Sequence, residues 1–459
     1  MQAEVNGVYV NFVGLRRISY KCVEKEVEGI KNAKRLDRAF EEIHRSVTRL
    51  KALGVFTDVS AHLTGGVGPN SMGVNMIFEE KLPKREFSIR IDESGRPGIE
   101  GSFSQPAFLG NLQGLELSAG AMGRQDTELQ AQWSFPKILG RHFPSDLRFF
   151  VTHRDFSVPS SFKEALKGAA FSLRSPDRAH TFTYTAVLRD LLPVTGGVRR
   201  ASNEVLHSRM RTAKSALTYA YVRDRIGKVP VPREGSFIGL KAEVAGLGGD
   251  ARHLKASADV ERVWLLSNEL DMVLNLTGSL GAAVPLKGAG APAISAAPDR
   301  ERVHLQDRFF IGGVSSYFTA LRGFASRRVG PTSQCRIAEE PESTHAERIK
   351  AKRFDHVGGE AFAAATATVS APLPYLGSVG GSGPRMFVSA SAGNVLPQLN
   401  RDNVRAFLPS ARVSLGVGIS MPLPVGTFEF SYGLPLKASS SDDKDNWQFA
   451  LRVRSIGGD

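Results

Sequence analysis

One arginine in this sequence is placed for strong, directional chemistry. Arg322 stands in a short segment together with Gly323 and Phe324. A guanidinium is a planar fork of donors that binds a carboxylate through two parallel hydrogen bonds, and Glu360 and Glu429 are the candidate partners. Gly323 would let the backbone turn tightly, and the Phe324 ring would fill an apolar niche. The pattern predicts a structural clamp; the alternative is an ordinary solvated loop arginine.

The residues around this clamp are aromatic, apolar or glycine. They are Phe309, Phe310, Gly312, Gly313 and Leu321. We interpret the two adjacent glycines as a turn. None of these side chains supplies a nucleophile or a general base, so the segment predicts packing and positioning.

Motifs that carry catalysis or hold a metal are absent from the sequence. It contains no phosphate-binding Walker loop, no His-Glu-x-x-His motif and no paired-cysteine motif. Cys22 and Cys335 are far apart and predict two unpaired thiols. We therefore expect no enzymatic activity, no metal and no cofactor. The net charge of +13 favours anionic surfaces but is spread along the chain, so it does not choose among nucleic acid, lipid headgroups and acidic peptides.

Residues 1–83 predict a small α/β domain. Strands are expected at 8–13, 55–63 and 72–78, and helices at 23–32 and 35–53, in the order strand, helix, helix, strand, strand. The second helix has an apolar face that should form the domain core: Leu36, Phe40, Ile43, Val47 and Leu50.

From residue 84 onward the hydrophobic period changes to two. No run approaches the roughly 18 apolar residues of a transmembrane helix, and the chain start lacks the layout of a signal peptide. The alternating segments predict sixteen strands, near 85–92, 98–105, 112–123, 126–136, 145–155, 165–174, 179–189, 210–222, 235–245, 251–264, 269–283, 359–373, 384–395, 411–420, 425–436 and 446–454. An even number suits a closed antiparallel transmembrane β-barrel, which leaves no unpaired edge in lipid. The alternative is a soluble β-rich binding module.

A long connection, residues 284–358, separates the eleventh and twelfth of these strands. Long loops in a compact fold are usually functional or disordered. Residues 289–297 are rich in Ala, Pro and Gly and predict a surface excursion, whereas residues 337–354 are charged and predict a solvated segment. The Arg322 segment lies between them.

The motifs in this connection resemble a known family. Asp307-Arg308-Phe309-Phe310-Ile311-Gly312-Gly313, Leu321-Arg322-Gly323-Phe324 and Val329-Gly330-Pro331 are similar to the signature loop of the outer-membrane assembly superfamily, which joins POTRA domains to a sixteen-stranded barrel. Segments downstream, such as Phe428-Glu429-Phe430, match as well, and Arg49-Leu50-Lys51-Ala52-Leu53-Gly54 resembles the end of the second POTRA helix. Here eight residues, 314–321, follow Gly313 where the family has about four.

The resemblance implies a fold, a location and partners. Residues 1–83 would be one POTRA domain, and 84–459 the barrel, with loop 284–358 folded into the lumen so that the Arg322 tip packs against the inner wall. One POTRA domain without a signal peptide points to the mitochondrial branch, the core subunit of the sorting and assembly machinery. That branch inserts unfolded β-barrel precursors into the mitochondrial outer membrane, with its POTRA domain in the intermembrane space. Its partners would be these precursors, accessory subunits and outer-membrane lipids, with no nucleic acid.

The mechanism implied by the resemblance is strand exchange at a lateral gate between the first and last strands. The residues expected to line it are Phe87, Ile89, Ile91, Phe449, Leu451 and Val453. A weakly paired edge would accept a client strand by β-augmentation. The rival within the same superfamily is a polypeptide-conducting pore of the chloroplast-envelope import or secretion type.

Overall fold

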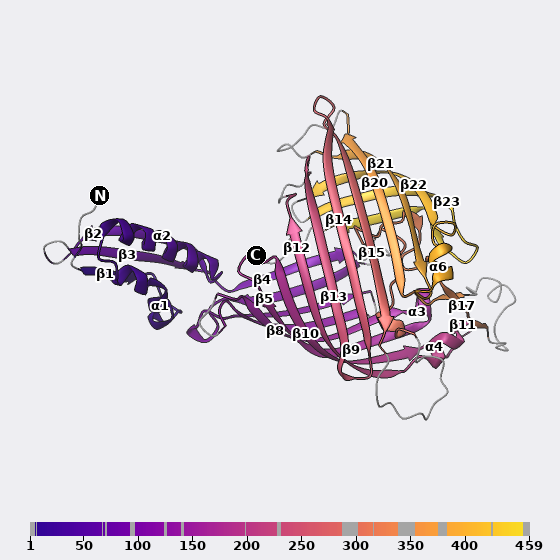
Figure 1. Ribbon diagram of the computed structural model, residues 1–459, viewed down its shortest axis with the longest axis horizontal. Helices are drawn as coiled ribbons and strands as arrows, with labels where there is room; N and C mark the ends of the chain where they lie inside the picture. The colour runs from indigo at the N-terminus through magenta and orange to yellow at the C-terminus, as the bar shows by residue number, and fades with distance from the viewer. Residues whose placement is uncertain are drawn as a thin grey trace.

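The computed structural model shows a sixteen-stranded barrel with a small α/β unit beside its first strands (Figure 1). It describes residues 5, 7–66, 68, 71–91, 97–123, 126–138, 142–197, 199–226, 231–286, 302–314, 316–337, 354–374, 383–423 and 426–452. The surface excursion predicted at 289–297 and most of the charged segment predicted at 337–354 lie outside these residues.

The N-terminal unit has the predicted order of elements. It contains β1 (Gly7–Val13), α1 (Tyr20–Lys31), α2 (Leu36–Ala52), β2 (Phe56–Gly65) and β3 (Ser71–Glu80). The sheet order is β1-β3-β2, with β1 parallel to β3 and β2 antiparallel to it. Apolar residues of the sheet and of both helices form one core cluster.

The prediction for the buried face of α2 was wrong at one residue. Phe40 is 47% exposed, whereas Leu50 is fully buried, and Leu36, Ile43 and Val47 pack against the core. Successive residues of an α-helix are about 100° apart, and the side chain turned fully into the core is that of Ala39. Sequence periodicity favoured the large residue over its small neighbour.

Glu80 joins the end of β3 to the turn before α1. Its Oε1 accepts hydrogen bonds from the backbone N–H groups of Arg16 (3.0 Å), Arg17 (3.0 Å) and Ile18 (2.9 Å). Burial raises the pKa of Glu80, but these donors outweigh burial and hold the pKa below its ordinary value of 4.5. The ionised carboxylate therefore stabilises the folded unit.

This arrangement predicts a loss of stability in acid. Because the folded pKa of Glu80 is depressed, its contribution is present above the unfolded pKa and is lost as the pH falls through the folded pKa. Hydrogen exchange of the full chain should show protection of residues 16–18 falling below about pH 4.5. Glu80→Ala, which strands these donors, should cost about 1–3 kcal/mol at neutral pH. The exposed neighbour Glu79, changed to Gln, is the control; equal effects of the two variants would contradict the assignment.

The barrel strands agree with the sixteen predicted segments within a few residues. They are β4 (Lys84–Ile91), β5 (Pro97–Gln105), β6 (Gly114–Met122), β7 (Asp126–Phe135), β8 (Ser145–Phe156), β9 (Phe162–Arg174), β10 (His180–Pro193), β12 (Arg211–Asp224), β13 (Gly235–Gly249), β14 (His253–Ser267), β15 (Met272–Pro285), β20 (Ala361–Pro372), β21 (Arg385–Leu396), β22 (Arg412–Leu423), β23 (Gly426–Lys437) and β25 (Trp447–Arg452). Each pairs antiparallel with its neighbour in chain order.

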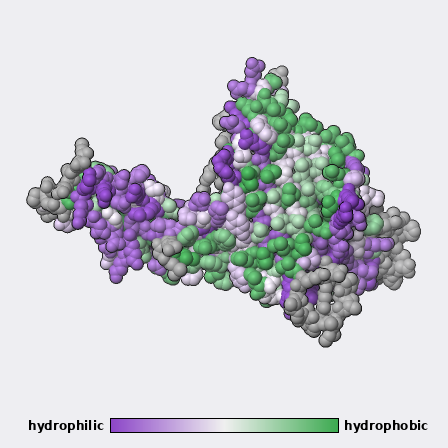
Figure 2. All heavy atoms as spheres, in the orientation of Figure 1, coloured by the Kyte–Doolittle hydropathy of each residue, from purple (hydrophilic) through white to green (hydrophobic). Residues whose placement is uncertain are grey.

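The alternation predicted from the sequence separates an apolar outer face from a polar inner one. Phe87, Leu129, Leu188, Leu280 and Val388 are among the large apolar residues exposed on the outside. Figure 2 shows these residue types gathered over the strands as a broad apolar surface, whereas the N-terminal unit is mainly hydrophilic. No helix in the described part of the chain is long and apolar enough to span a membrane.

The N-terminal unit contacts the turns at its own end of the barrel. The N–H of Ser19 donates to the carbonyl of Gly110 (3.0 Å) in the turn η1 (Phe108–Gly110), and Ala107 belongs to the core of the unit. Glu26 of α1 forms an ion pair with Lys137, between β7 and β8. The unit therefore shares its core and its charges with the barrel.

The opposite end of the barrel carries the long connections. They contain α3 (Ser157–Ser160), β11 (Arg199–Arg200), α4 (Asn203–His207), β17 (Thr332–Gln334), β18 (Arg336–Ile337), β19 (Phe354–His356) and α6 (Arg401–Arg405). Figure 1 shows these elements away from the N-terminal unit. The carboxylate of Asp355, which is fully buried, joins them by accepting from Ser161 Oγ (2.6 Å), Ser202 N (2.8 Å) and Arg199 Nη2 (2.7 Å).

Candidate functional site

The predicted loop 284–358, whose first two residues belong to β15 in the structure, is called the lumen loop below. Backbone bridges pair Phe309 with Gly359, Ile311 with Val329 and Gly313 with Leu321, so the described part of the loop doubles back on itself. Its apolar residues pack on the inner wall of the barrel; the cluster comprises Phe309, Ile311, Leu321, Phe324, Val329, Phe362 and Val395. The loop is therefore held in the lumen by its own apolar side chains.

Arg322 lies at the buried tip of the lumen loop. Its side chain is 4% exposed, and its Nη2 is 3.0 Å from Oε2 of Glu429 in β23. The guanidinium carbon lies 4.7 Å from the ring centre of Phe387 in β21, which adds a cation–π contact. A Cβ at Gly416 in β22 would come within 2.7 Å of Arg322 Cδ, so a glycine there leaves the space that the arginine occupies.

Glu360, the other predicted partner, contacts a different part of the loop. Its Oε1 accepts a hydrogen bond from the backbone N–H of Val303 at 2.9 Å. Glu360 thus fastens the start of the described loop segment, while Glu429 contacts its tip. The sequence did not separate these two roles. Glu360 directly precedes β20 and Glu429 lies at an inward position of β23, so each was a plausible partner of Arg322.

Gly323 and Phe324 attach the tip to the last barrel strand. They form β16 (Gly323–Phe324), which pairs with β24 (Lys444–Asp445). The side-chain amide of Gln448 in β25 accepts from Gly323 N (3.0 Å) and donates to Phe324 O (2.7 Å). Gly323 has φ +85°, and a Cβ there would meet the backbone of Gly433 at 2.8 Å. Only glycine fits this close approach.

The residues that precede the tip are also fixed. Gly312 and Gly313 have positive φ angles of 116° and 75°, and a Cβ at either would come within 3 Å of the backbone at Ala325 or Ser326. The two glycines therefore allow a close approach inside the loop; Gly313 itself is bridged to Leu321 and forms no turn. The Phe309 ring contacts Phe362 and lies 4.3 Å from the ammonium of Lys255. The Phe310 ring lies 3.9 Å from the guanidinium of Arg327, measured from ring centre to Cζ.

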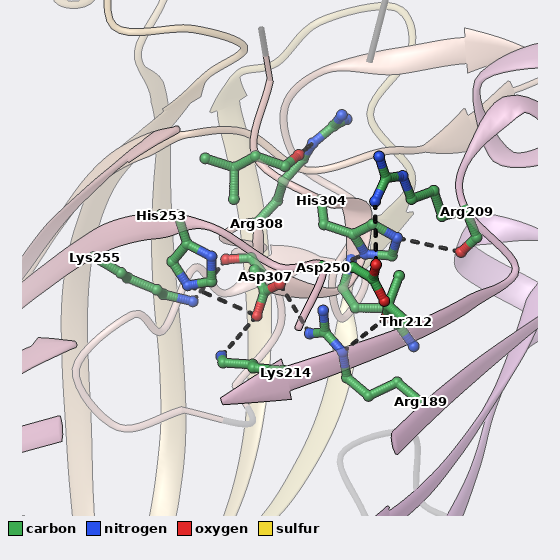
Figure 3. Close-up of polar contacts among 12 residues, drawn as sticks. Arg189, Arg209, Thr212, Lys214, Asp250, His253, Lys255, His304, Asp307 and Arg308 are labelled. Atoms are coloured by element: carbon green, nitrogen blue, oxygen red, sulfur yellow. Dashed lines mark hydrogen bonds and ion pairs between the residues drawn. The ribbon is translucent and has the colours of Figure 1, made fainter. Parts of the chain in front are cut away.

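The stem of the loop, the segment that ends at Asp307, is held by charged side chains of β10, β12, β13 and β14. This Asp307 cluster comprises Arg189, Lys214, Glu243, His253, Lys255 and Asp307. Asp307 ends η3 (Leu305–Asp307) and contacts Arg189 Nη1 and Lys214 Nζ, each at 2.8 Å, while its carbonyl accepts from Lys255 Nζ. Figure 3 shows these side chains converging on Asp307 from the barrel wall.

The charges of the cluster favour an ionised aspartate. Burial raises the pKa of Asp307, but Arg189 and Lys214 outweigh burial and hold the pKa far below its ordinary value. Ligand atoms of Glu243, His253 and Asp307 lie within 4.8 Å of one another, a spacing that could suit a metal ion. Since Lys214 contacts both carboxylates, we interpret the group as an ion-pair network.

The extra residues between Gly313 and Arg322 reach the wall at a third place. Tyr317 donates to Glu261 of β14 (2.6 Å), and the Phe318 ring stacks on Phe237 of β13 with centres 5.3 Å apart. The side-chain hydroxyl of Thr366 in β20 donates to Ala320 O at 2.9 Å. The eight residues 314–321 therefore add contacts with β13, β14 and β20 before the tip.

A cavity of about 690 Å³ remains beside the loop tip. Residues of β5 to β8 line one side, and Arg327 and Arg328 of the loop line the other. Glu100, Glu128 and Arg154 give this space a charged lining. The loop thus leaves room next to β5 to β8.

The first and last strands meet at a junction called the seam below. β4 and β25 are the two edges of the sheet, and they approach each other, but the described backbone contains no ladder between them. Phe87 in β4 and Phe449 in β25 are 72% and 47% exposed. Leu451 is half-buried. Ile89 and Ile91 belong to β4 but their side chains are outside the described set, and Val453 lies outside the described residues.

Sequence reasoning missed the residues that fasten the loop away from Arg322. Gln448 stands in an alternating strand and looks like any inward polar residue. The Asp307 cluster combines side chains from β10, β12, β13, β14 and the loop. One signal was present: Lys214, Glu243 and Lys255 are charged residues at inward positions of predicted strands.

Comparison with known proteins assigns the fold to a family. The Omp85 superfamily domain matches residues 108–452. A sorting and assembly machinery component 50 homolog of Xenopus tropicalis is 26% identical and covers 97% of this chain and 90% of its own length. The human homolog is also 26% identical, with 98% and 90% covered.

A solved structure has the same fold. BamA from Haemophilus ducreyi lacking POTRA domains 1–3 superposes with a TM-score of 0.76 at 17% identity, covering 96% of this chain and 83% of that one. The predicted sixteen-stranded barrel with a small POTRA-like α/β region is confirmed. So are the predicted resemblance to the core subunit of the sorting and assembly machinery and the location in the mitochondrial outer membrane. The chain belongs to the Omp85 superfamily.

Proposed function

We propose that this chain folds β-barrel precursor proteins and inserts them into the mitochondrial outer membrane through the seam between β4 and β25. The vertebrate relatives named after the sorting and assembly machinery support the assembly function. The entry of clients at the seam rests on the geometry described next. No nucleotide is required, because forming backbone hydrogen bonds inside lipid is itself favourable.

The missing ladder between β25 and β4 among the described residues is the observation that carries the proposal. On its other side, β25 pairs with β23 from Tyr432 to Thr427. The edge of β25 that faces β4 is therefore the one without a described strand partner. An edge strand presents unpaired N–H and C=O groups, which can pair with a strand of another chain. A precursor strand that adds at this edge would gain main-chain hydrogen bonds by β-augmentation.

The lumen loop would set the position of this edge. Its tip contacts β25 through Gln448, and it contacts β23 through Glu429. A tip that holds both β23 and β25 keeps the edge of β25 in one orientation and at one depth in the membrane. We infer that the loop positions β25 for exchange, and that the stem at the Asp307 cluster keeps the loop itself from moving.

The N-terminal unit, residues 1–83, would receive clients in the intermembrane space, with the barrel formed by residues 84–459. The unit lies at the barrel end opposite the long connections (Figure 1). It contacts the turns that hold Gly110 and Lys137, beside the first strands. Accessory subunits and outer-membrane lipids would complete the environment of the barrel.

Site-specific photo-cross-linking can test entry at the seam. A photoreactive residue is placed at Phe87, at Phe449, or at Leu280 of β15, which is 60% exposed on the wall away from the seam. With an arrested precursor, we expect adducts at Phe87 and Phe449 and none at Leu280. A fourth position, Arg154 beside the lumen cavity, tests the rival. Adducts at Arg154 without adducts at the seam would overturn the proposal and favour a conducting pore.

A further inference from the structure

The connection between β21 and β22, residues 397–411, lies at the barrel end opposite the N-terminal unit and is called the rim loop below. It contains the short helix α6 (Arg401–Arg405), whose first turn is capped by Asn400. Lys437 of β23 donates to the carbonyl of Pro409, so the loop is also fastened to the neighbouring hairpin. The roles proposed for the lumen-loop tip and for the seam do not account for the exposed side chains of the rim loop.

The rim loop covers a position on the outer face of the barrel. Asn394 pairs in the ladder with Ala363, which pairs with Leu280, and Leu280 is 60% exposed on the outside. Residues directly opposite each other in a sheet share one face. Asn394 nevertheless is buried, because its Nδ2 donates to Phe407 O (3.1 Å) and Ser410 Oγ (2.8 Å) of the rim loop. Asn394 Oδ1 also accepts from Arg412 Nη1 (2.5 Å), so this amide joins the rim loop to the start of β22.

The rim loop presents apolar side chains next to basic ones. Leu399, Val404 and Leu408 are 46%, 51% and 78% exposed. Arg401 and Arg405 are also exposed. A water-facing turn has no reason to expose three aliphatic side chains within ten residues. A segment at a membrane surface does, because aliphatic groups enter the acyl boundary while arginines reach the headgroups.

We propose that the rim loop is a membrane-interface anchor that inserts Leu399, Val404 and Leu408 into the adjacent leaflet and binds anionic phospholipid headgroups through Arg401 and Arg405. Two observations favour lipid over a protein partner. The rim loop joins β21 and β22, whose outer faces expose Val388 and Leu415. The basic pair complements an anionic headgroup. The anchor would hold the β21–β22 hairpin, which contacts the loop tip through Phe387, at a fixed depth.

Spin-label accessibility tests this anchor in the full-length protein in lipid vesicles. A nitroxide is attached to Leu408→Cys in a Cys22→Ser background, since the remaining Cys335 is buried. We expect the label to collide with oxygen more than with a water-soluble nickel complex, as at Leu280→Cys in the lipid belt. Leu63→Cys in the N-terminal unit is the aqueous control.

Lipid composition separates insertion from headgroup binding. Vesicles of phosphatidylcholine alone are compared with vesicles that also contain an anionic phospholipid. We expect the anionic lipid to deepen the label at position 408, and Arg401→Gln with Arg405→Gln to remove that difference. A label as accessible to the nickel complex as Leu63→Cys in both vesicles would overturn the proposal and indicate a protein partner. Depth that is independent of anionic lipid would overturn the headgroup part.

Discussion

Replacing Arg322 by alanine should release the tip of the lumen loop while the barrel still forms. The change leaves Glu429, whose side chain is 13% exposed, without its guanidinium partner. Removing one member of a buried ion pair typically costs about 3–5 kcal/mol, and water in the lumen would reduce that cost by screening. Even a residual loss of about 1.4 kcal/mol raises the undocked population tenfold. We therefore expect slower assembly of client barrels, because β25 loses its attachment through the tip.

The measurement combines client assembly with protease sensitivity of residues 307–331. Arg322→Lys should restore only part of the activity, since an ammonium cannot reproduce the planar fork. Glu429→Gln should resemble Arg322→Ala. Arg38→Ala, which removes an exposed arginine of α2, is the matched control. Assembly and protection that stay unchanged in Arg322→Ala would mean that the arginine has no part in the mechanism.

Changing Asp307 to asparagine should destabilise the stem of the same loop. Arg189, Lys214 and Lys255 would then face one another with only Glu243 to balance them. Like charges in a poorly solvated space repel strongly, so we expect a loss of about 3–5 kcal/mol, again reduced by lumen water. Because Arg189 and Lys214 hold the pKa of Asp307 far below its ordinary value, the wild-type anchor should persist in mild acid.

Heat-modifiable migration in detergent gels reports this loss. The temperature at which the folded band disappears should be lower for Asp307→Asn than for the wild type. Asp177→Asn, in the exposed turn between β9 and β10, is the matched control. Arg189→Gln combined with Asp307→Asn should cost less than the sum of the two single changes, as expected for residues in contact. Equal unfolding temperatures for Asp307→Asn and Asp177→Asn would refute the anchor.

The fold was predictable because lipid imposes a strict rule on each strand. A barrel strand must present apolar residues outward at every second position, so Phe182, Tyr184 and Leu188 mark β10 as a strand, and the repetition of this pattern over sixteen segments favours a barrel over a soluble sheet. The contact at the loop tip could also be predicted, because an inward-facing carboxylate is the expected partner of an arginine in the lumen. Glu429 and Glu360 were both candidates, and only the packing of the loop distinguishes their contacts.

The remaining contacts could not be predicted because they depend on how strands far apart in sequence are arranged around the lumen. Asp307 meets Arg189 and Lys214, which lie 118 and 93 residues before it. Gln448 contacts the tip from β25. Alternation indicates which side chains of a strand face inward, but not where that strand lies around the barrel axis. Ala39 is buried in place of Phe40 because of the rotation of α2 about its own axis. The positions of the apolar residues in the sequence determine that rotation only to within about one residue.

The two attachments of the lumen loop imply an order of events when this chain itself folds. The stem docks on β10, β12 and β14, which are all synthesised before the loop, whereas the tip needs Glu429 and Gln448 from strands that come more than 100 residues after it. The stem and tip contacts span similar separations, 93 and 118 residues against 107 and 125, so the order in which the strands are made decides which forms first, and loop-closure entropy does not. The stem should therefore dock first, and the tip should dock only after β25 has joined the sheet. Docking of the tip would then occur only in a completed barrel.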